Sequence, residues 1–182
     1  MHLIISCMDR RLNRYLQGMA SGQTVFVRNA GANVATLKDT LGSLEGVESV
    51  TIITHTDCGA MGVVEQVLRG NDRPDDLAEF MRPFIGLRPD RDEIERENGE
   101  LQADAVRKMM DVEVKSILVN TGTLRYESTG RYRALFMRPS GNTVPKERVD
   151  STYVIQNSPP GDRSTDIYIA RNFLKIREFD QE

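Results

Sequence analysis

Short apolar runs alternate along the chain with longer stretches in which apolar residues recur every three or four positions. The short runs have the pattern of strands buried on both faces of a parallel sheet, and they cover residues 3–6, 25–27, 50–54 and 116–119. The longer stretches have the period of helices, with apolar faces within residues 12–19, 34–44, 63–68 and 101–110. This alternation predicts an α/β fold with a mostly parallel central sheet of about four strands, flanked by helices on both faces.

The C-terminal third of the chain has a less regular pattern. Residues 126–132 have the composition of a hairpin turn between short strands, which would add an antiparallel edge strand to the sheet. Residues 152–155 and 167–169 are predicted as two further strands. The chain breaker Ser158-Pro159-Pro160-Gly161 separates them.

The polar segment 71–99 is the least regular part of the middle of the chain, with helical fragments near residues 77–85 and 90–97.

A chain of 182 residues is long enough for one domain with a substantial core and short for two. We therefore expect a single domain that spans residues 1–182.

Charge and hydropathy exclude several classes of partner. The formal net charge is −3, and lysine and arginine are interspersed with acidic residues, so we expect no binding of nucleic acid or of an anionic membrane surface. No segment approaches the roughly 20 apolar residues that cross a bilayer. The apolar run after His2 is too short for a secretory signal, so the expected location is the cytoplasm.

The candidate chemistry lies where two predicted strands end. Cys7 follows the first strand, and His55 and Cys58 follow the third. Ligand sites gather at the carboxyl ends of parallel strands, so these three side chains converge if the two strands are neighbours. Two thiolates and one imidazole are a recognised set for catalytic zinc with a fourth position open. Zinc there would lower the pKa of a bound water to about 7 and give hydroxide at neutral pH.

Two charged residues accompany Cys7. In an extended strand end, the period of two places Asp9 and Arg11 on the same side as Cys7. Asp9 could fill the fourth zinc position and close the site. Alternatively, Asp9 could accept a hydrogen bond from the hydroxide while the planar guanidinium of Arg11 holds its carboxylate through two bonds. Taken singly, the aspartate is also typical of a helix cap and the arginine of a solvated face.

Three motifs follow one another in an order that resembles the β-class carbonic anhydrases: Cys7-Met8-Asp9-Arg10-Arg11, Arg28-Asn29-Ala30-Gly31 and His55-Thr56-Asp57-Cys58-Gly59. The similarity covers residues 3–70 and is extended by residues 126–130. It implies reversible hydration of carbon dioxide to bicarbonate by a zinc enzyme, a lyase that acts as a homodimer or higher oligomer.

The resemblance also implies roles for individual residues. Zinc would be held by Cys7, His55 and Cys58, with Asp9 and Arg11 as the pair beside it. At two further positions in the motifs, Gly31 and Gly59 would let the backbone pass close to the substrate pocket, although glycines there are also ordinary turn residues.

The chain departs from the family at both ends. Family members usually carry helical sequence before the first strand, and here that strand starts at residue 3. Residues 137–182 run past the usual end of the family, so we expect them to be an extension used in assembly. The chain has no tryptophan, so the Trp-dependent bicarbonate pocket of some members does not apply. His2 is expected to be a surface residue rather than a proton shuttle.

Other functions fit the same residues. The same hydroxide could hydrolyse carbonyl sulfide or carbon disulfide. A site closed by Asp9 would make the chain a non-catalytic zinc protein that serves assembly. The two cysteines could instead form a disulfide or be buried apolar residues of a domain without metal.

Overall fold

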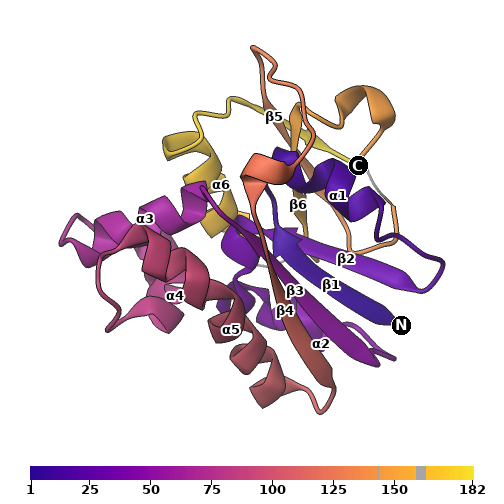
Figure 1. Ribbon diagram of the computed structural model, residues 1–182, viewed down its shortest axis with the longest axis horizontal. Coiled ribbons are helices and arrows are strands. Elements are labelled where there is room, and N and C mark those ends of the chain that lie inside the picture. Colours follow the sequence, from indigo (N-terminus) through magenta and orange to yellow (C-terminus); the bar gives the residue numbers. More distant parts are fainter. Residues whose placement is uncertain (143, 159–162) are drawn as a thin grey trace.

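The computed structural model describes residues 1–142, 144–158 and 163–182. The described part contains a seven-stranded sheet with the order β4-β3-β1-β2-β6-β5-β7 (Figure 1). The strands are β1 (His2–Cys7), β2 (Thr24–Asn29), β3 (Ser49–His55), β4 (Glu113–Val119), β5 (Arg133–Met137), β6 (Thr152–Gln156) and β7 (Glu178–Gln181). Neighbouring strands run parallel except at the pair β2–β6, which is antiparallel. The sheet confirms the predicted α/β fold.

Helices pack around this sheet. They are α1 (Asn13–Gln17), α2 (Lys38–Gly42), α3 (Gly59–Leu68), α4 (Ala78–Met81), α5 (Arg91–Met109) and α6 (Arg163–Asn172). Figure 1 shows α3, α4 and α5 on one side of the view, and the yellow helix α6 near the strand ends from which α3 departs. In the described part of the chain, none of the helices combines the length and the apolar character of a membrane span.

Strand β1 is buried on both faces, as its continuous apolar run predicts. Ile4 belongs to a core cluster that includes residues of α3, α4 and α6. Its neighbours Leu3 and Ile5 point to the opposite face, where they join a second cluster with α2 and the C-terminal half of α5. All three side chains are at most 1% exposed, and each such burial stabilises the fold by about 1.5–3 kcal/mol. The centre of the sheet is therefore a rigid support for the residues at its strand ends.

The carboxyl ends of β1 and β3 lie side by side. The two strands are parallel neighbours, with Ser6 paired with Ile53 in the register. Cys7 is the last residue of β1, and His55 is the last residue of β3. The first and third strands are therefore neighbours, which is the condition under which the three side chains converge.

The C-terminal third differs from the sequence prediction in two places. Residues 126–132 form no strand or hairpin, because the chain runs as coil from Leu124 to β5. Residues 167–169 are not a strand but the middle of α6, whose buried residues are Thr165, Asp166, Ile169 and Ala170. This spacing of one and four is helical, and an apolar run of three residues does not distinguish it from a strand.

The antiparallel strand also lies elsewhere than predicted. β6, which includes the predicted run 152–155, pairs with β2 inside the sheet and not at its edge. The two edges are β4 and β7, and the sequence pattern did not predict β7. Residues 159–161 of the predicted breaker lie outside the described residues. Extension residues 137–182 thus contribute strands to the same sheet, and their use in assembly stays a prediction.

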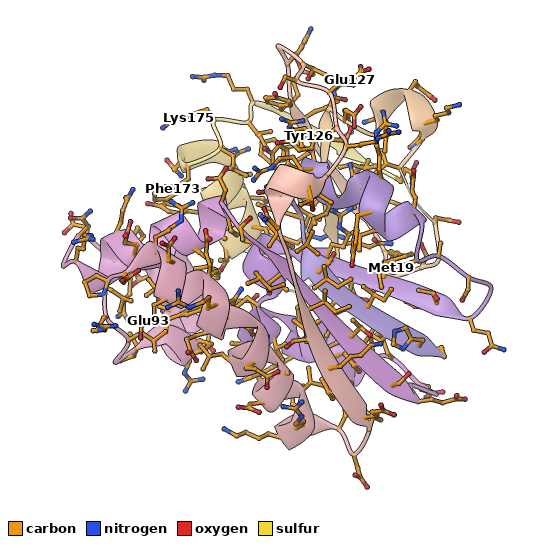
Figure 2. All side chains as sticks on the ribbon, in the orientation of Figure 1. Met19, Glu93, Tyr126, Glu127, Phe173 and Lys175 are labelled. Carbon is orange, nitrogen blue, oxygen red and sulfur yellow. The ribbon has the colours of Figure 1, made fainter. Side chains whose placement is uncertain are left out.

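Arg10 connects the loop after β4 to the C-terminal third of the chain. Figure 2 shows Tyr126 and Glu127, in the loop after β4, near the top of the same view as Phe173 and Lys175, which follow α6. Arg10 holds the Tyr126 loop, because its guanidinium lies 5.3 Å from the ring centre of Tyr126 and donates a 3.0 Å hydrogen bond to the Glu127 carbonyl. The same guanidinium donates to the Asp150 carbonyl at 2.9 Å. Arg10 therefore joins the first strand's end to the C-terminal third.

Candidate metal centre

Three side chains from two neighbouring strand ends meet in the interior. The ligand atoms of Cys7, His55 and Cys58 all lie within 4.8 Å of one another. Cys7 ends β1, His55 ends β3, and Cys58 directly precedes α3. Their exposed fractions are 4%, 2% and 2%. Two sulfurs and one ring nitrogen at this separation match the ligand types that zinc prefers.

The imidazole of His55 is oriented for ligation. Its Nδ1 lies 2.8 Å from the Thr56 carbonyl, which can only accept, so Nδ1 carries the hydrogen. Nε2 is buried and has no hydrogen-bond partner among the residues that the structure describes. A backbone acceptor that fixes the tautomer and leaves the other nitrogen free is typical of a metal-binding histidine. The residues present therefore fit a zinc ion.

Without metal, the pKa values of Cys7, His55 and Cys58 depend on one another. A hydrogen bond from the Cys58 thiol lowers the pKa of Cys7 well below its ordinary value, although burial opposes this. The same hydrogen bond, together with burial, raises the pKa of Cys58. Burial lowers the pKa of His55, but the neighbouring Cys7 thiolate outweighs this effect and raises it to about 9. Zinc would have to displace protons from His55 and Cys58, which makes its binding favourable at raised pH.

Asp9 is bound by Arg11 through both carboxylate oxygens. Oδ1 accepts hydrogen bonds from the backbone N and the Nε of Arg11, at 2.8 and 3.0 Å, and Oδ2 accepts one from Nη2 at 2.8 Å. Oδ2 lies 3.7 Å from Nε2 of His55. Burial raises the pKa of Asp9, but the hydrogen bonds and charge of Arg11 lower it more, so the net shift is downward. The carboxylate is thus held ionised beside the cluster.

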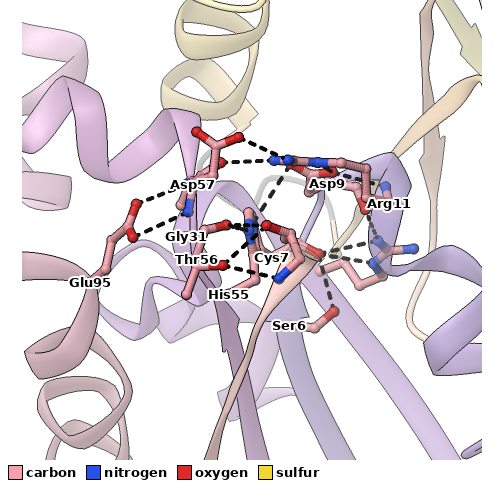
Figure 3. A network of polar contacts seen from close by, with 12 residues as sticks. Ser6, Cys7, Asp9, Arg11, Gly31, His55, Thr56, Asp57 and Glu95 are labelled. Atoms are coloured by element: carbon pink, nitrogen blue, oxygen red, sulfur yellow. Dashed lines mark hydrogen bonds and ion pairs between the residues drawn. The ribbon is translucent and has the colours of Figure 1, made fainter. Parts of the chain in front are cut away.

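Arg11 also reaches the loop that carries Cys58. Its Nη1 donates to Oδ2 of Asp57 at 3.1 Å, and its Nη2 donates to the Asp57 carbonyl at 2.8 Å. Figure 3 shows Arg11 extended from Asp9 toward Asp57 across the top of the site. One guanidinium therefore joins the two strand ends that supply the candidate ligands.

Glu95 in α5 is a site residue that the sequence analysis missed. Glu95 is 6% exposed. Its carboxylate accepts hydrogen bonds from the backbone N of Asp57 at 3.1 Å and of Cys58 at 2.9 Å, on the far side of the loop from Arg11 (Figure 3). Arg91, one turn earlier, donates to Glu95 at 3.1 Å and to the Cys58 carbonyl at 2.6 Å. Asp57 has a left-handed φ of 52°, so the loop needs such support. The only sign of this pair in the sequence is the spacing of Arg91 and Glu95, which lie four residues apart as in a helical ion pair.

The two predicted glycines have different surroundings. A Cβ at Gly59 would lie 2.9 Å from Cδ2 of Leu174, and Gly59 lines a small cavity beside the cluster. Gly31 has a φ of 70°, and a Cβ there would lie 2.8 Å from Cε of Met61. It is not among the residues that line the cavity. Gly31 is thus required by backbone conformation and packing, whereas Gly59 is required by the close approach of Leu174.

The cavity is about 10 Å³ in volume, which is enough for one water molecule. Its walls are Cys7, Met8, Asp9, Gly59, Ala60, Tyr153 and Leu174. The walls combine one thiol and one carboxylate with apolar groups. A site of this kind suits a very small, weakly polar molecule next to the metal position.

A family model described as carbonic anhydrase matches residues 2–128, which include all three candidate ligands. The chain belongs to the carbonic anhydrase family. This match confirms the resemblance to the β-class enzymes. A solved carbonic anhydrase from Glaciozyma antarctica is 25% identical, and the alignment covers 68% of this chain and 79% of that one, with a TM-score of 0.42. No curated protein matches the chain.

Proposed function

We propose that this carbonic anhydrase family member is a zinc enzyme that hydrates carbon dioxide reversibly to bicarbonate. The observation that carries the proposal is the meeting of Cys7, His55 and Cys58, in which the buried Nε2 of His55 has no hydrogen-bond partner among the described residues. These three residues would hold the zinc ion. When bound, zinc would supply the Lewis acid that makes a water molecule nucleophilic at neutral pH.

Asp9 would orient the reacting water rather than occupy the fourth metal position. Each carboxylate oxygen has two lone pairs, and Oδ2 uses one of them for Arg11. The remaining capacity can accept the hydrogen of a water in the cavity that Asp9 lines. Arg11 would keep the carboxylate in place through its paired hydrogen bonds. This arrangement supports a catalytic site over a zinc site closed by Asp9.

The size of the cavity supports carbon dioxide over its sulfur analogues. The cavity has room for one water molecule, so a substrate must widen it, and the side chains of Met8 and Ala60 give it apolar walls. Carbonyl sulfide and carbon disulfide carry one or two larger sulfur atoms in place of oxygen. We therefore expect hydration of carbon dioxide to be faster than release of sulfide from either analogue.

Assembly and location follow from the family only as predictions. A homodimer or higher oligomer, and a cytoplasmic location, are what we expect of this chain. Light scattering on the full chain measures the oligomeric state, and we expect a mass at least twice that of one chain.

The test of the function is zinc content together with carbon dioxide hydration. Zinc-loaded protein should contain one zinc per chain and hydrate carbon dioxide above the buffer rate in a stopped-flow assay. Cys58→Ser removes one ligand and should lose both zinc and activity. One bound zinc without hydration between about pH 7 and 9 would leave only the zinc-scaffold function.

A further inference from the structure

Two walls of the cavity come from outside the part of the chain that matches the family model. The match ends at residue 128, whereas Tyr153 lies in β6 and Leu174 follows α6. The remaining walls come from the end of β1, from the two residues after it and from the start of α3. The cavity therefore forms only when the C-terminal third folds back over the strand ends.

β6 is joined directly to the residue after Cys7. The backbone N of Val154 donates to the Met8 carbonyl at 3.0 Å. This bond places the adjacent Tyr153 against the cavity, where it is 9% exposed. Its ring packs edge-on against Tyr132, with the ring centres 6.2 Å apart. Tyr153 is thus a fixed wall rather than a surface side chain.

A buried carboxylate joins α6 to the other side of the site. Oδ1 of Asp166, a residue that is 1% exposed, accepts a hydrogen bond from the backbone N of Ala30 at 2.9 Å. Ala30 immediately precedes Gly31 in the turn after β2. A hydrogen bond from a buried backbone donor fixes the helix relative to this turn. The start of α6 is therefore anchored to the core.

The end of α6 directs Leu174 onto Gly59. Lys175 has a left-handed φ of 58°, and the backbone N of Ile176 donates to the Ala170 carbonyl at 2.9 Å. This turn reverses the chain after the helix and buries Ile176. Leu174 is left over Gly59, close enough that a Cβ at residue 59 would approach its Cδ2 to 2.9 Å. Leu174 and Gly59 together close the cavity.

We propose that Tyr153 and Leu174 are specificity-determining residues, which close the substrate pocket from within the same chain and restrict it to very small molecules. The substrate restriction rests on the proposed function. The closure itself concerns access to Cys7, which lines the cavity, and it can be measured without activity. Both residues act through the space that they fill. The C-terminal third would thus be part of the reaction site.

Thiol labelling tests the closure directly, because the chain contains only two cysteines. The metal-free full chain is treated with iodoacetamide, which is small, and with 5,5'-dithiobis(2-nitrobenzoate), which is bulky. Leu174→Ala should accelerate the bulky reagent about tenfold or more and the small one less, since a wall has been removed. Phe173→Ala is the matched control, because Phe173 packs on Tyr168 and does not line the cavity.

The ratio of the two labelling rates separates an opened wall from a loosened fold. Global unfolding exposes the thiols equally to both reagents. A variant that reacts only through unfolding therefore has the same ratio of bulky to small labelling rates as the unfolded protein. Leu174→Val, a smaller truncation, gives the same test if the alanine variant does not fold. An unchanged ratio in the folded Leu174 variants, or an equal change in Phe173→Ala, would overturn the proposal.

A second measurement addresses the substrate restriction. Zinc-loaded wild type and Leu174→Ala are compared for carbon dioxide hydration and for hydrolysis of 4-nitrophenyl acetate, a bulkier probe. The variant should raise the ratio of ester to carbon dioxide activity about tenfold, whereas Phe173→Ala should not. An unchanged ratio would overturn the restriction. Labelling that opens in a protein without any hydration would instead reject the proposed function and leave the closure in place.

Discussion

Asp9 and Arg11 form a bidentate ion pair beside the candidate metal centre. Nε of Arg11 donates to Oδ1 of Asp9 at 3.0 Å, and Nη2 donates to Oδ2 at 2.8 Å. The same guanidinium holds Asp57, next to Cys58. The pair therefore controls both the carboxylate beside His55 and the loop that carries one candidate ligand.

Replacing Arg11 by lysine should impair catalysis and leave the metal in place. A lysine keeps the charge but cannot make two parallel bonds to the carboxylate, so Asp9 becomes free to move toward the metal position. We expect kcat/KM for carbon dioxide hydration to fall about tenfold to a hundredfold, with one zinc per chain retained. Arg14→Lys is the control, because Arg14 makes a similar pair with Asp150 away from the site. Equal activity of the Arg11 variant and wild type would remove Arg11 from the account.

Replacing Glu95 by glutamine should weaken zinc binding. The carboxylate accepts from the backbone N of both Asp57 and Cys58, and an amide nitrogen cannot accept. One backbone donor would lose its partner, and the ligand loop would be less well fixed. We expect the zinc dissociation constant, measured by competition with a chelator, to rise about tenfold to a hundredfold.

Glu93→Gln is the matched control for Glu95. Glu93 lies in the same helix and pairs only with the exposed Arg88 among the described contacts of its side chain. Surface pairs of this kind contribute little, about 0–1 kcal/mol, so zinc affinity should stay at the wild-type value. A Glu95 variant that binds zinc as tightly as the Glu93 variant would show that the loop holds Cys58 without help from α5.

The raised pKa of Tyr153 predicts that the free energy of unfolding falls at alkaline pH. Burial, followed by the charge of Asp9, raises its pKa from 10 to about 12. The folded state therefore keeps the phenol proton when the unfolded state has lost it. This contribution is fully present below pH 10 and is lost as the pH rises from 10 to about 12, with a total of about 2–3 kcal/mol.

Urea unfolding from about pH 9 to 12 checks this contribution. Tyr153→Phe should show a smaller decline of the free energy of unfolding than wild type over the interval. Tyr168→Phe, in α6, serves as the control and should follow the wild-type curve. The same decline in Tyr153→Phe and wild type would mean that the phenol is equally solvated in both states.

The sequence predicts those parts of the site that depend on local pattern and on one rule of sheet geometry. Cys7 and His55 end apolar runs, and the carboxyl ends of adjacent parallel strands must meet. Glu95 could not be found this way. It is separated from Cys58 by 37 residues, and its contact depends on how α5 packs against the sheet. The same limit applies to Leu174, whose place over Gly59 depends on the turn after α6.

The errors in the fold have the same physical origin. Residues 167–169 combine two isoleucines with a tyrosine, and this composition favours a strand when the partners on either side are unknown. Packing of Asp166 and Ile169 on the core selects the helix instead. Residues 126–132 have the composition of a turn, but Arg10 holds this loop between β4 and β5 without strand pairing. Tertiary contacts decide both segments.

The most direct test of the account is the rate of carbon dioxide hydration by zinc-loaded wild type and Asp9→Asn, measured by stopped flow from about pH 7 to 9. We expect clear activity in the wild type that rises with pH, and a loss of about a hundredfold in the variant with one zinc per chain retained. Equal rates in the two proteins, or loss of zinc from Asp9→Asn, would contradict the role of Asp9 as the acceptor beside an open metal site.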